Sequence, residues 1–244
     1  MTIRYEINPP KTTDPPSRID LLDERIEQVS KHCDGIHVTD SVLGIERISP
    51  LIIGTEIKQK HPELQVTISL RVIDKKIDQI TDFVDAAVHA NLDAILVLMG
   101  DPSPDNNYKS GIIPSYAVSS LVKRGYNEKI KILLSLPSMP NFDKISKKIN
   151  SQPFGFVTQV IHNISQVKRL SEHLSSKNFK IIPCLLYPSE KNSRSAEFLN
   201  LDWSNYRDDF SLFVSQVENI TGDILITSPN DFKGALDFLT RLQK

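Results

Sequence analysis

The sequence predicts an α/β fold, a (β/α)8 TIM barrel that forms a single domain over residues 1–244. Two observations carry this prediction. Apolar strand-like runs alternate with amphipathic stretches about eight times along the chain, whereas a doubly wound sheet more often has about five or six strands. Most of the runs are almost continuously apolar, as parallel strands buried on both faces should be.

The expected elements follow one another at regular spacing. We expect helices over Lys75–Asn91, Ile164–Ser176 and Asn230–Leu242, because each has apolar residues at helical spacing on one face. The last of them starts with an Asn-Asp pair that can cap its first turn. The expected strands are Ile3–Ile7, Gly35–Val38, Gln65–Leu70, Ala94–Leu98, Lys131–Leu136, Phe154–Val160, Lys180–Leu186 and Asp223–Thr227.

Three polar or proline-rich segments follow predicted strands. They are Pro9–Pro16 after the first strand, Pro102–Pro114 after the fourth and Pro188–Arg194 after the seventh. In a barrel of this type the loops that follow strands gather at one face, and active sites lie at that face. Long loops there are usually functional. We therefore expect the functional site at the carboxyl ends of the strands.

Composition excludes several classes of protein. Of the 244 residues 39% are hydrophobic, which is enough for one large core. The 29 Lys and Arg residues nearly balance the 30 Asp and Glu residues, so no basic field predicts nucleic-acid binding. We find no signal peptide and no membrane span in the sequence. The two cysteines and six histidines lack metal-site spacing, so we expect no metal. The two cysteines also lack the spacing of a redox motif, so a reducing cytoplasm is the expected location.

Two carboxylates at strand ends are the strongest functional signal. Glu6 lies inside the first apolar strand, and Asp101 follows the fourth strand and a glycine. A carboxylate in apolar surroundings is costly without a function or a partner. The alternative for Glu6 is an ion pair or a solvated strand end. The alternative for Asp101 is a turn residue, because Asp before Pro often starts a turn.

Five segments, in the same order and at similar spacing, resemble the methylenetetrahydrofolate reductase family. The resemblance runs over the whole chain and fits a barrel with these segments on its strands. The segments are Tyr5-Glu6-Ile7-Asn8-Pro9-Pro10-Lys11, Leu98-Met99-Gly100-Asp101-Pro102, Thr158-Gln159, Ile181-Ile182-Pro183 and Asp223-Ile224-Leu225-Ile226-Thr227.

The resemblance implies an oxidoreductase of one-carbon metabolism. Its reaction would reduce 5,10-methylene-tetrahydrofolate, or a related tetrahydropterin, to the 5-methyl form, with NAD(P)H acting directly or through FAD. Glu6 would be the general acid, because burial should raise its pKa. Asp101 would bind the pterin and stabilise the cation that accepts hydride. Gln159 would bind the edge of the pterin ring, or else be a satisfied barrel-lining amide.

The same resemblance places six residues near the flavin, and several of them depart from the family pattern. Ser69, Met99, Ser135 and Met139 each lack a polar or aromatic contact that the resembled family offers, so we expect FAD to bind weakly. Arg71 would meet a phosphate or a glutamate tail, or neutralise a nearby carboxylate. The six expected cofactor-binding residues are His37, Ser69, Arg71, Ser135, Met139 and Lys148.

Two other functions stay open at this point. One is a pterin-binding or methyl-transfer barrel that has lost redox chemistry, which the altered flavin-side residues would suit. The other is a non-catalytic subunit that partners an active paralogue. The sequence also leaves open whether the chain forms a homo-oligomer.

Overall fold

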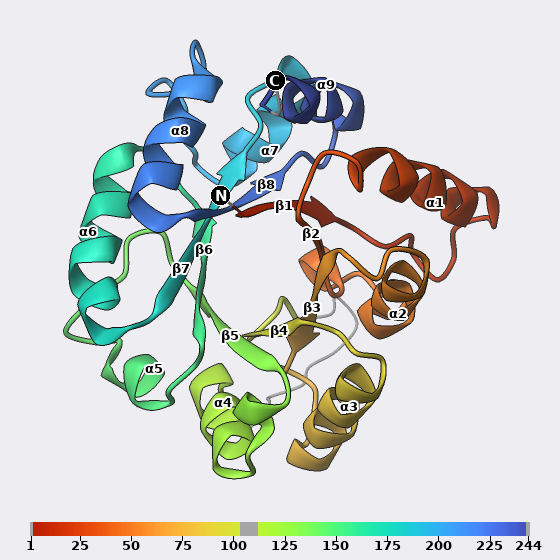
Figure 1. Ribbon diagram of the computed structural model, residues 1–244, viewed down its shortest axis with the longest axis vertical. Coiled ribbons are helices and arrows are strands. Elements are labelled where there is room, and N and C mark those ends of the chain that lie inside the picture. The colour runs from red at the N-terminus through yellow and green to blue at the C-terminus, as the bar shows by residue number, and fades with distance from the viewer. Residues whose placement is uncertain (1, 103–111, 243–244) are drawn as a thin grey trace.

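Eight parallel strands close into a barrel, and helices surround it (Figure 1). The structure is a computed structural model that describes residues 2–102 and 112–242. The strands pair in chain order from β1 to β8, and β8 pairs with β1 to close the barrel. The prediction of a (β/α)8 TIM barrel is therefore confirmed.

The elements alternate along the chain as the sequence predicts. The strands are β1 Thr2–Ile7, β2 Gly35–Val38, β3 Gln65–Arg71, β4 Ala94–Leu98, β5 Lys131–Leu136, β6 Gly155–Val160, β7 Lys180–Leu186 and β8 Asp223–Thr227. The α-helices are α1 Ser17–Val29, α2 Pro50–Lys60, α3 Ile77–His89, α4 Pro114–Lys123, α5 Ser146–Asn150, α6 Ile164–Leu174, α7 Ser193–Phe198, α8 Phe210–Thr221 and α9 Phe232–Leu242. Short 3-10 turns include η1 Val42–Gly44 and η4 Glu190–Asn192.

The predicted boundaries are close to the observed ones. Each predicted strand overlaps an observed strand and differs from it by at most one residue at either end. The three predicted helices are α3, α6 and α9, each slightly shorter than expected. The segment Pro188–Arg194 differs from the predicted loop, because η4 and the start of α7 lie within it. The predicted loop Pro102–Pro114 falls mostly on residues 103–111, outside the described residues.

Side chains on the two faces of the barrel have different surroundings. The outward-facing residues of the strands, such as Ile36, Ile68 and Phe156, are fully buried against the helices in one large apolar core. Inside the barrel a smaller apolar cluster forms a waist, which consists of Ala94, Leu96, Leu133, Val157, Ile182, Cys184 and Leu225. Polar side chains lie on either side of this waist and line a cavity at each end of the barrel.

Successive side chains of β1 alternate between the outer apolar core and the interior of the barrel. Ile3, Tyr5 and Ile7 belong to the outer core, whereas Arg4 and Glu6 line the two cavities inside the barrel. Successive side chains of a strand point to opposite faces, so Arg4 and Glu6 share the inner face. They lie on opposite sides of the apolar waist. Among the described residues no helix is long and apolar enough to cross a membrane.

We predict that Phe156→Ala destabilises the fold by about 3–5 kcal/mol, because it leaves a cavity in the outer core. Phe156 is fully buried and meets the ring of Phe179 edge-on, with 5.2 Å between ring centroids. Urea unfolding measures the change. The matched control is Phe198→Ala, since Phe198 is 71% exposed and its loss should cost less than about 0.5 kcal/mol. Equal losses in the two variants would contradict the assigned packing.

Candidate functional site

A cavity of about 200 Å³ opens at the carboxyl ends of the strands, where the sequence predicts the functional site. Its floor is the apolar waist, and its walls carry the polar side chains at the strand ends. We call it the mouth cavity. Its lining includes Glu6, His37, Thr39, Asp40, Ser41, Ser69, Leu96, Leu98, Gly100, Asp101, Ser135, Val157, Thr158, Gln159, Cys184 and Leu225. The structure thus brings Glu6, Asp101 and Gln159 to one cavity.

Glu6 lies on the inner face of β1 and meets the end of β8. Its Oε1 accepts a hydrogen bond from the Thr227 hydroxyl at 2.7 Å. Burial raises the pKa of Glu6 above its ordinary value of 4.5, and the Thr227 hydrogen bond opposes that shift only in part. No ion pair involves Glu6 among the described residues, so the predicted alternative of a buried ion pair does not hold there. A carboxyl group in this setting holds its proton to a higher pH than a free one.

Asp101 lies at the rim and holds the loop that follows β2. Its Oδ2 accepts a hydrogen bond from the Leu43 amide at 3.1 Å, and its main-chain oxygen accepts one from Arg71 at 2.9 Å. Gly100 makes this arrangement feasible, because it has φ +80° and its α-carbon packs on the Arg71 stem where a Cβ would overlap. Asp101 is therefore both a lining residue of the mouth cavity and an anchor of its rim.

Arg71 makes its contacts with residues of the cavity rim, and its buried Nε has no partner among the residues that the structure describes. Its guanidinium group forms an ion pair with Asp74, and its amide donates to Asp40 Oδ2 at 3.2 Å. The sequence left open whether Arg71 meets a ligand or neutralises a carboxylate. In the structure its partner is Asp74, and neither Glu6 nor Asp101 receives an ion pair from it.

His37 lies on the inner face of β2, opposite Glu6 in the pairing of β1 with β2. Its Nε2 is 2.9 Å from the Ser69 hydroxyl on β3. Burial, and then the positive charge of Arg4, lowers the pKa of His37 to about 3. The imidazole is therefore neutral near pH 7 and offers a hydrogen bond without charge. Within residues 2–102 and 112–242, no three His, Cys, Asp or Glu side chains gather as metal ligands would.

An irregularity in the pairing of β6 with β7 shapes the side of the mouth cavity that β6 lines. The register shifts between Val157 and Val160, and the Thr158 hydroxyl accepts a hydrogen bond from the Cys184 amide at 3.1 Å. Because of this shift the consecutive residues Val157, Thr158 and Gln159 all line the mouth cavity. The exposed side chain of Gln159 is free to present its amide to a ligand.

The expected flavin-side residues divide into two groups. His37, Ser69 and Ser135 line the mouth cavity. Met139 is 71% exposed and lines a separate cleft with Phe142 and Arg169. The amine of Lys148 donates to the main-chain oxygen of Ser135, and burial lowers the pKa of that amine. The sequence-based assignment of these residues to a cofactor stays a prediction.

Sequence reasoning missed two residues of the mouth cavity region. Thr227, the partner of Glu6, was seen only as the end of a strand, although the closure of a barrel always places the end of the last strand beside the first. Asp40 lines the cavity two residues after β2. It carries the same signal that singled out Asp101, a carboxylate just after an apolar strand.

Comparison with known families gives one clear match. Residues 1–187 match the family described as methylenetetrahydrofolate reductase. This match includes Glu6, Asp101 and Gln159, and it ends before β8. No curated protein sequence matches the chain.

Solved structures share the fold at low sequence identity. One is described as an uncharacterized protein from Clostridium thermocellum that binds two copies of 5-methyl-5,6,7,8-tetrahydrofolic acid. It is 19% identical, with a TM-score of 0.68 over 100% of this chain and 94% of the other. A second is 3-hexulose-6-phosphate synthase, 12% identical, with a TM-score of 0.57 over 99% of each chain. At these identities the likeness shows the barrel fold alone.

We predict that the stability of Glu6→Gln relative to wild type rises with pH above 4.5. Because the pKa of Glu6 is raised, its stabilising contribution is complete below the unfolded value of 4.5 and is lost as pH rises through the folded pKa. Each unit of that shift is worth about 1.4 kcal/mol. Urea unfolding of both proteins at pH 5 and pH 8 measures this relative stability. A relative stability that is the same at the two pH values would contradict the assigned burial, and Glu24→Gln on the exposed face of α1 is the control.

We also predict that Asp101→Ala speeds hydrogen exchange at the Leu43 amide by about two- to tenfold, because that amide loses its acceptor. The rim is strained there, since Ser41 and Leu43 have φ of 42° and 59°. Asp101→Asn is the matched control, because its side-chain oxygen can still accept the bond. The assigned anchor is wrong if Leu43 exchanges at the same rate in wild type and Asp101→Ala.

Proposed function

The chain belongs to the methylenetetrahydrofolate reductase family, and from this premise we propose that it binds a reduced folate in the mouth cavity and reduces the 5,10-methylene form to the 5-methyl form. NAD(P)H is the proposed source of electrons. A solved structure of the same fold, described as binding 5-methyl-5,6,7,8-tetrahydrofolic acid, supports a reduced folate as the ligand. The observation that carries the proposal is the half-buried carboxyl of Glu6 in the mouth cavity, with its raised pKa.

The walls of the mouth cavity suit a flat, polar-edged ring such as a pterin. Leu96, Leu98 and Val157 offer apolar surface, and Gln159 offers both a donor and an acceptor at the rim. A few directed polar groups in a largely apolar cavity are typical of small-molecule sites. The proposed pterin lies on this apolar surface with its polar edge toward Gln159.

Glu6 has the properties that the first chemical step needs. Opening the five-membered ring of the methylene compound requires a proton on the departing nitrogen. The carboxyl of Glu6 gives that proton, and the methylene carbon becomes an iminium carbon on the other nitrogen. Hydride from NAD(P)H then converts this carbon to a methyl group, and Glu6 regains a proton from water. An acid with a raised pKa keeps its proton to a higher pH than an ordinary glutamate does, which suits a general acid.

Asp101 is proposed to act on the cation by its charge. It lines the mouth cavity, and its position is fixed by the Leu43 amide and by Arg71. A fixed carboxylate favours a cationic intermediate without having to reorient as the charge forms. Asp40, on the same rim, adds a second negative charge.

The described residues fit an FAD poorly. The mouth cavity of about 200 Å³ is smaller than the roughly 300–1,000 Å³ typical of ligand sites, which leaves little room for the three-ring flavin of FAD beside a pterin, whereas the nicotinamide of NAD(P)H is a single ring. Lys148 and Arg71 are engaged with Ser135 and Asp74, and Met139 lies in another cleft. Nothing in the proposed proton transfer depends on FAD, and weak FAD binding remains our expectation.

The poor fit to FAD favours one alternative, a barrel that binds a reduced folate, or transfers its methyl group, without redox chemistry. It would keep the pterin-side residues Glu6, Asp101 and Gln159 and would need no flavin-side contacts. A non-catalytic partner of an active paralogue would share these features. Activity of the purified chain separates the reductase from both.

We predict that the purified chain oxidises NAD(P)H when 5,10-methylene-tetrahydrofolate is present and forms 5-methyl-tetrahydrofolate. Glu6→Gln should lower this rate by about 10²–10⁴-fold, because glutamine keeps the shape but cannot give a proton. Binding of 5-methyl-tetrahydrofolate, followed by fluorescence quenching, should change little in the variant. Assays with and without added FAD show whether the flavin contributes.

Two outcomes would contradict the proposal in different ways. Near-normal turnover of Glu6→Gln would remove Glu6 as the acid. Binding of 5-methyl-tetrahydrofolate without any turnover, with FAD and both nicotinamides supplied, would favour the binding or methyl-transfer barrel.

A further inference from the structure

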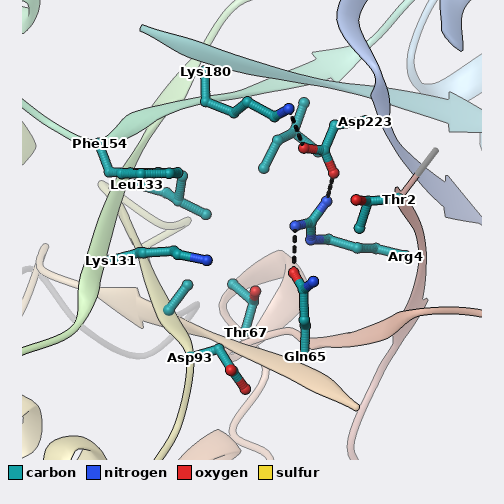
Figure 2. A pocket seen from close by; sticks show the side chains of 12 residues that line it. Thr2, Arg4, Gln65, Thr67, Asp93, Lys131, Leu133, Phe154, Lys180 and Asp223 are labelled. Atoms are coloured by element: carbon teal, nitrogen blue, oxygen red, sulfur yellow. Dashed lines mark hydrogen bonds and ion pairs between the residues drawn. The ribbon is translucent and has the colours of Figure 1, made fainter. Parts of the chain in front are cut away.

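A second cavity lies at the opposite end of the barrel, where the strands begin (Figure 2). It measures about 250 Å³, and the apolar waist separates it from the mouth cavity. We call it the basal cavity. Figure 2 shows Arg4, Lys131 and Lys180 extending toward the same space from β1, β5 and β7. The proposed function makes no use of this end of the barrel.

Arg4 is a buried cation whose hydrogen bonds are incomplete. Its residue is only 9% exposed. Its guanidinium group forms an ion pair with Asp223 and donates to the Gln65 side-chain oxygen at 2.9 Å, whereas its buried Nε has no partner in the structure. Loss of hydration lowers the pKa of Arg4 to about 10. A buried guanidinium group with an unpaired donor is costly, and an additional acceptor would relieve that cost.

The carboxylates of the basal cavity do not balance its cations. Asp223 is shared, because it pairs with Arg4 and also with Lys180 at 2.9 Å. Asp93 is already engaged, since its Oδ2 lies 2.9 Å from the Lys58 amine and accepts from the Val66 amide at 2.8 Å. Asp34 and Asp93 act on Arg4 from a greater distance, whereas Asp223 is the one carboxylate among the described residues in direct contact with the cations that line the cavity.

Lys131 is the cation of the basal cavity that has no ion-pair partner among the described residues. Its amine lies 5.5 Å from the centre of the Phe154 ring, and no carboxylate of the described chain is within ion-pair distance of it. The pKa of Lys180 is lowered by burial and then by the nearby charges of Arg4 and Lys131. The three cations thus repel one another across a space that is large enough for a small ligand.

We propose that the basal cavity binds a small oxyanion, a phosphate or carboxylate group, held by Arg4, Lys131 and Lys180. An oxyanion brings an acceptor to the buried guanidinium group of Arg4 and a negative charge to Lys131, and such charge-assisted hydrogen bonds are stronger than neutral ones. The simpler reading is that these cations only close the barrel around Asp223. That explanation accounts for Arg4 and Lys180, which both pair with Asp223, but it does not explain why Lys131 lies beside them without a carboxylate partner among the described residues.

Calorimetric titration with inorganic phosphate at neutral pH tests the proposal, with sodium chloride at equal ionic strength to remove the general salt effect. Succinate is the second probe, and the tighter of the two identifies which oxyanion the cavity prefers. We expect saturable binding that Lys131→Gln weakens on the order of tenfold, because one charged contact is lost. Lys131 is exposed, so this variant should fold. The matched control is Lys168→Gln, an exposed lysine on α6, which should bind within about twofold of wild type.

Three results would overturn the proposal. One is no saturable binding of phosphate or succinate above the chloride control. Another is equal affinity in Lys131→Gln, Lys180→Gln and the Lys168→Gln control. The third is loss of oxyanion binding in Arg71→Gln, which would place the anion at the rim of the mouth cavity. Folate binding is measured separately, so failure here leaves the proposed function of the mouth cavity untouched.

Discussion

The pairing of β1 with β8 closes the barrel, and both polar ends of its interior depend on that closure. Thr2 pairs with Asp223 and Tyr5 with Ile226, so residues from the two ends of the chain lie side by side. At the base this register joins Arg4 to Asp223. At the mouth it joins Glu6 to Thr227. These contacts span almost the whole sequence, so no local segment of the chain could form either of them before the barrel closes.

The apolar waist gives the two ends separate chemistry. It keeps water out of the middle of the barrel and places Glu6 on a floor where its carboxylate form is poorly solvated. The same waist keeps Arg4 on its own side, where a shortage of acceptors leaves a cationic cavity. One strand, β1, thus carries a proton-retaining acid and a buried cation two residues apart. The burial of each is set by its position above or below the waist, and β1 alternates so that both point inward.

Most of the fold and part of the candidate site could be predicted from the sequence, because these features leave local patterns in it. Strands buried on both faces leave long apolar runs, so their boundaries were predicted to within a residue, and Glu6 stood out as a carboxylate inside one of them. The partner of Glu6, Thr227, depends on closure of the barrel and has no local signal. Arg71 was seen as a charge at a strand end, but its pairing with Asp74 depends on side-chain geometry that spacing does not show. The basal cavity was missed because Arg4 and Lys131 look like ordinary charges at strand starts.

The central claim is that Glu6, in the mouth cavity of a reduced-folate site, holds its proton to a higher pH than an ordinary glutamate. The most direct test follows the carboxyl carbon-13 signal of Glu6, assigned by its absence in Glu6→Gln, as pH is varied with and without 5-methyl-tetrahydrofolate. The account predicts a titration midpoint above 4.5 in the free protein and a change in the signal when the folate binds. A midpoint at or below 4.5, or a signal that the folate leaves unchanged, would contradict it.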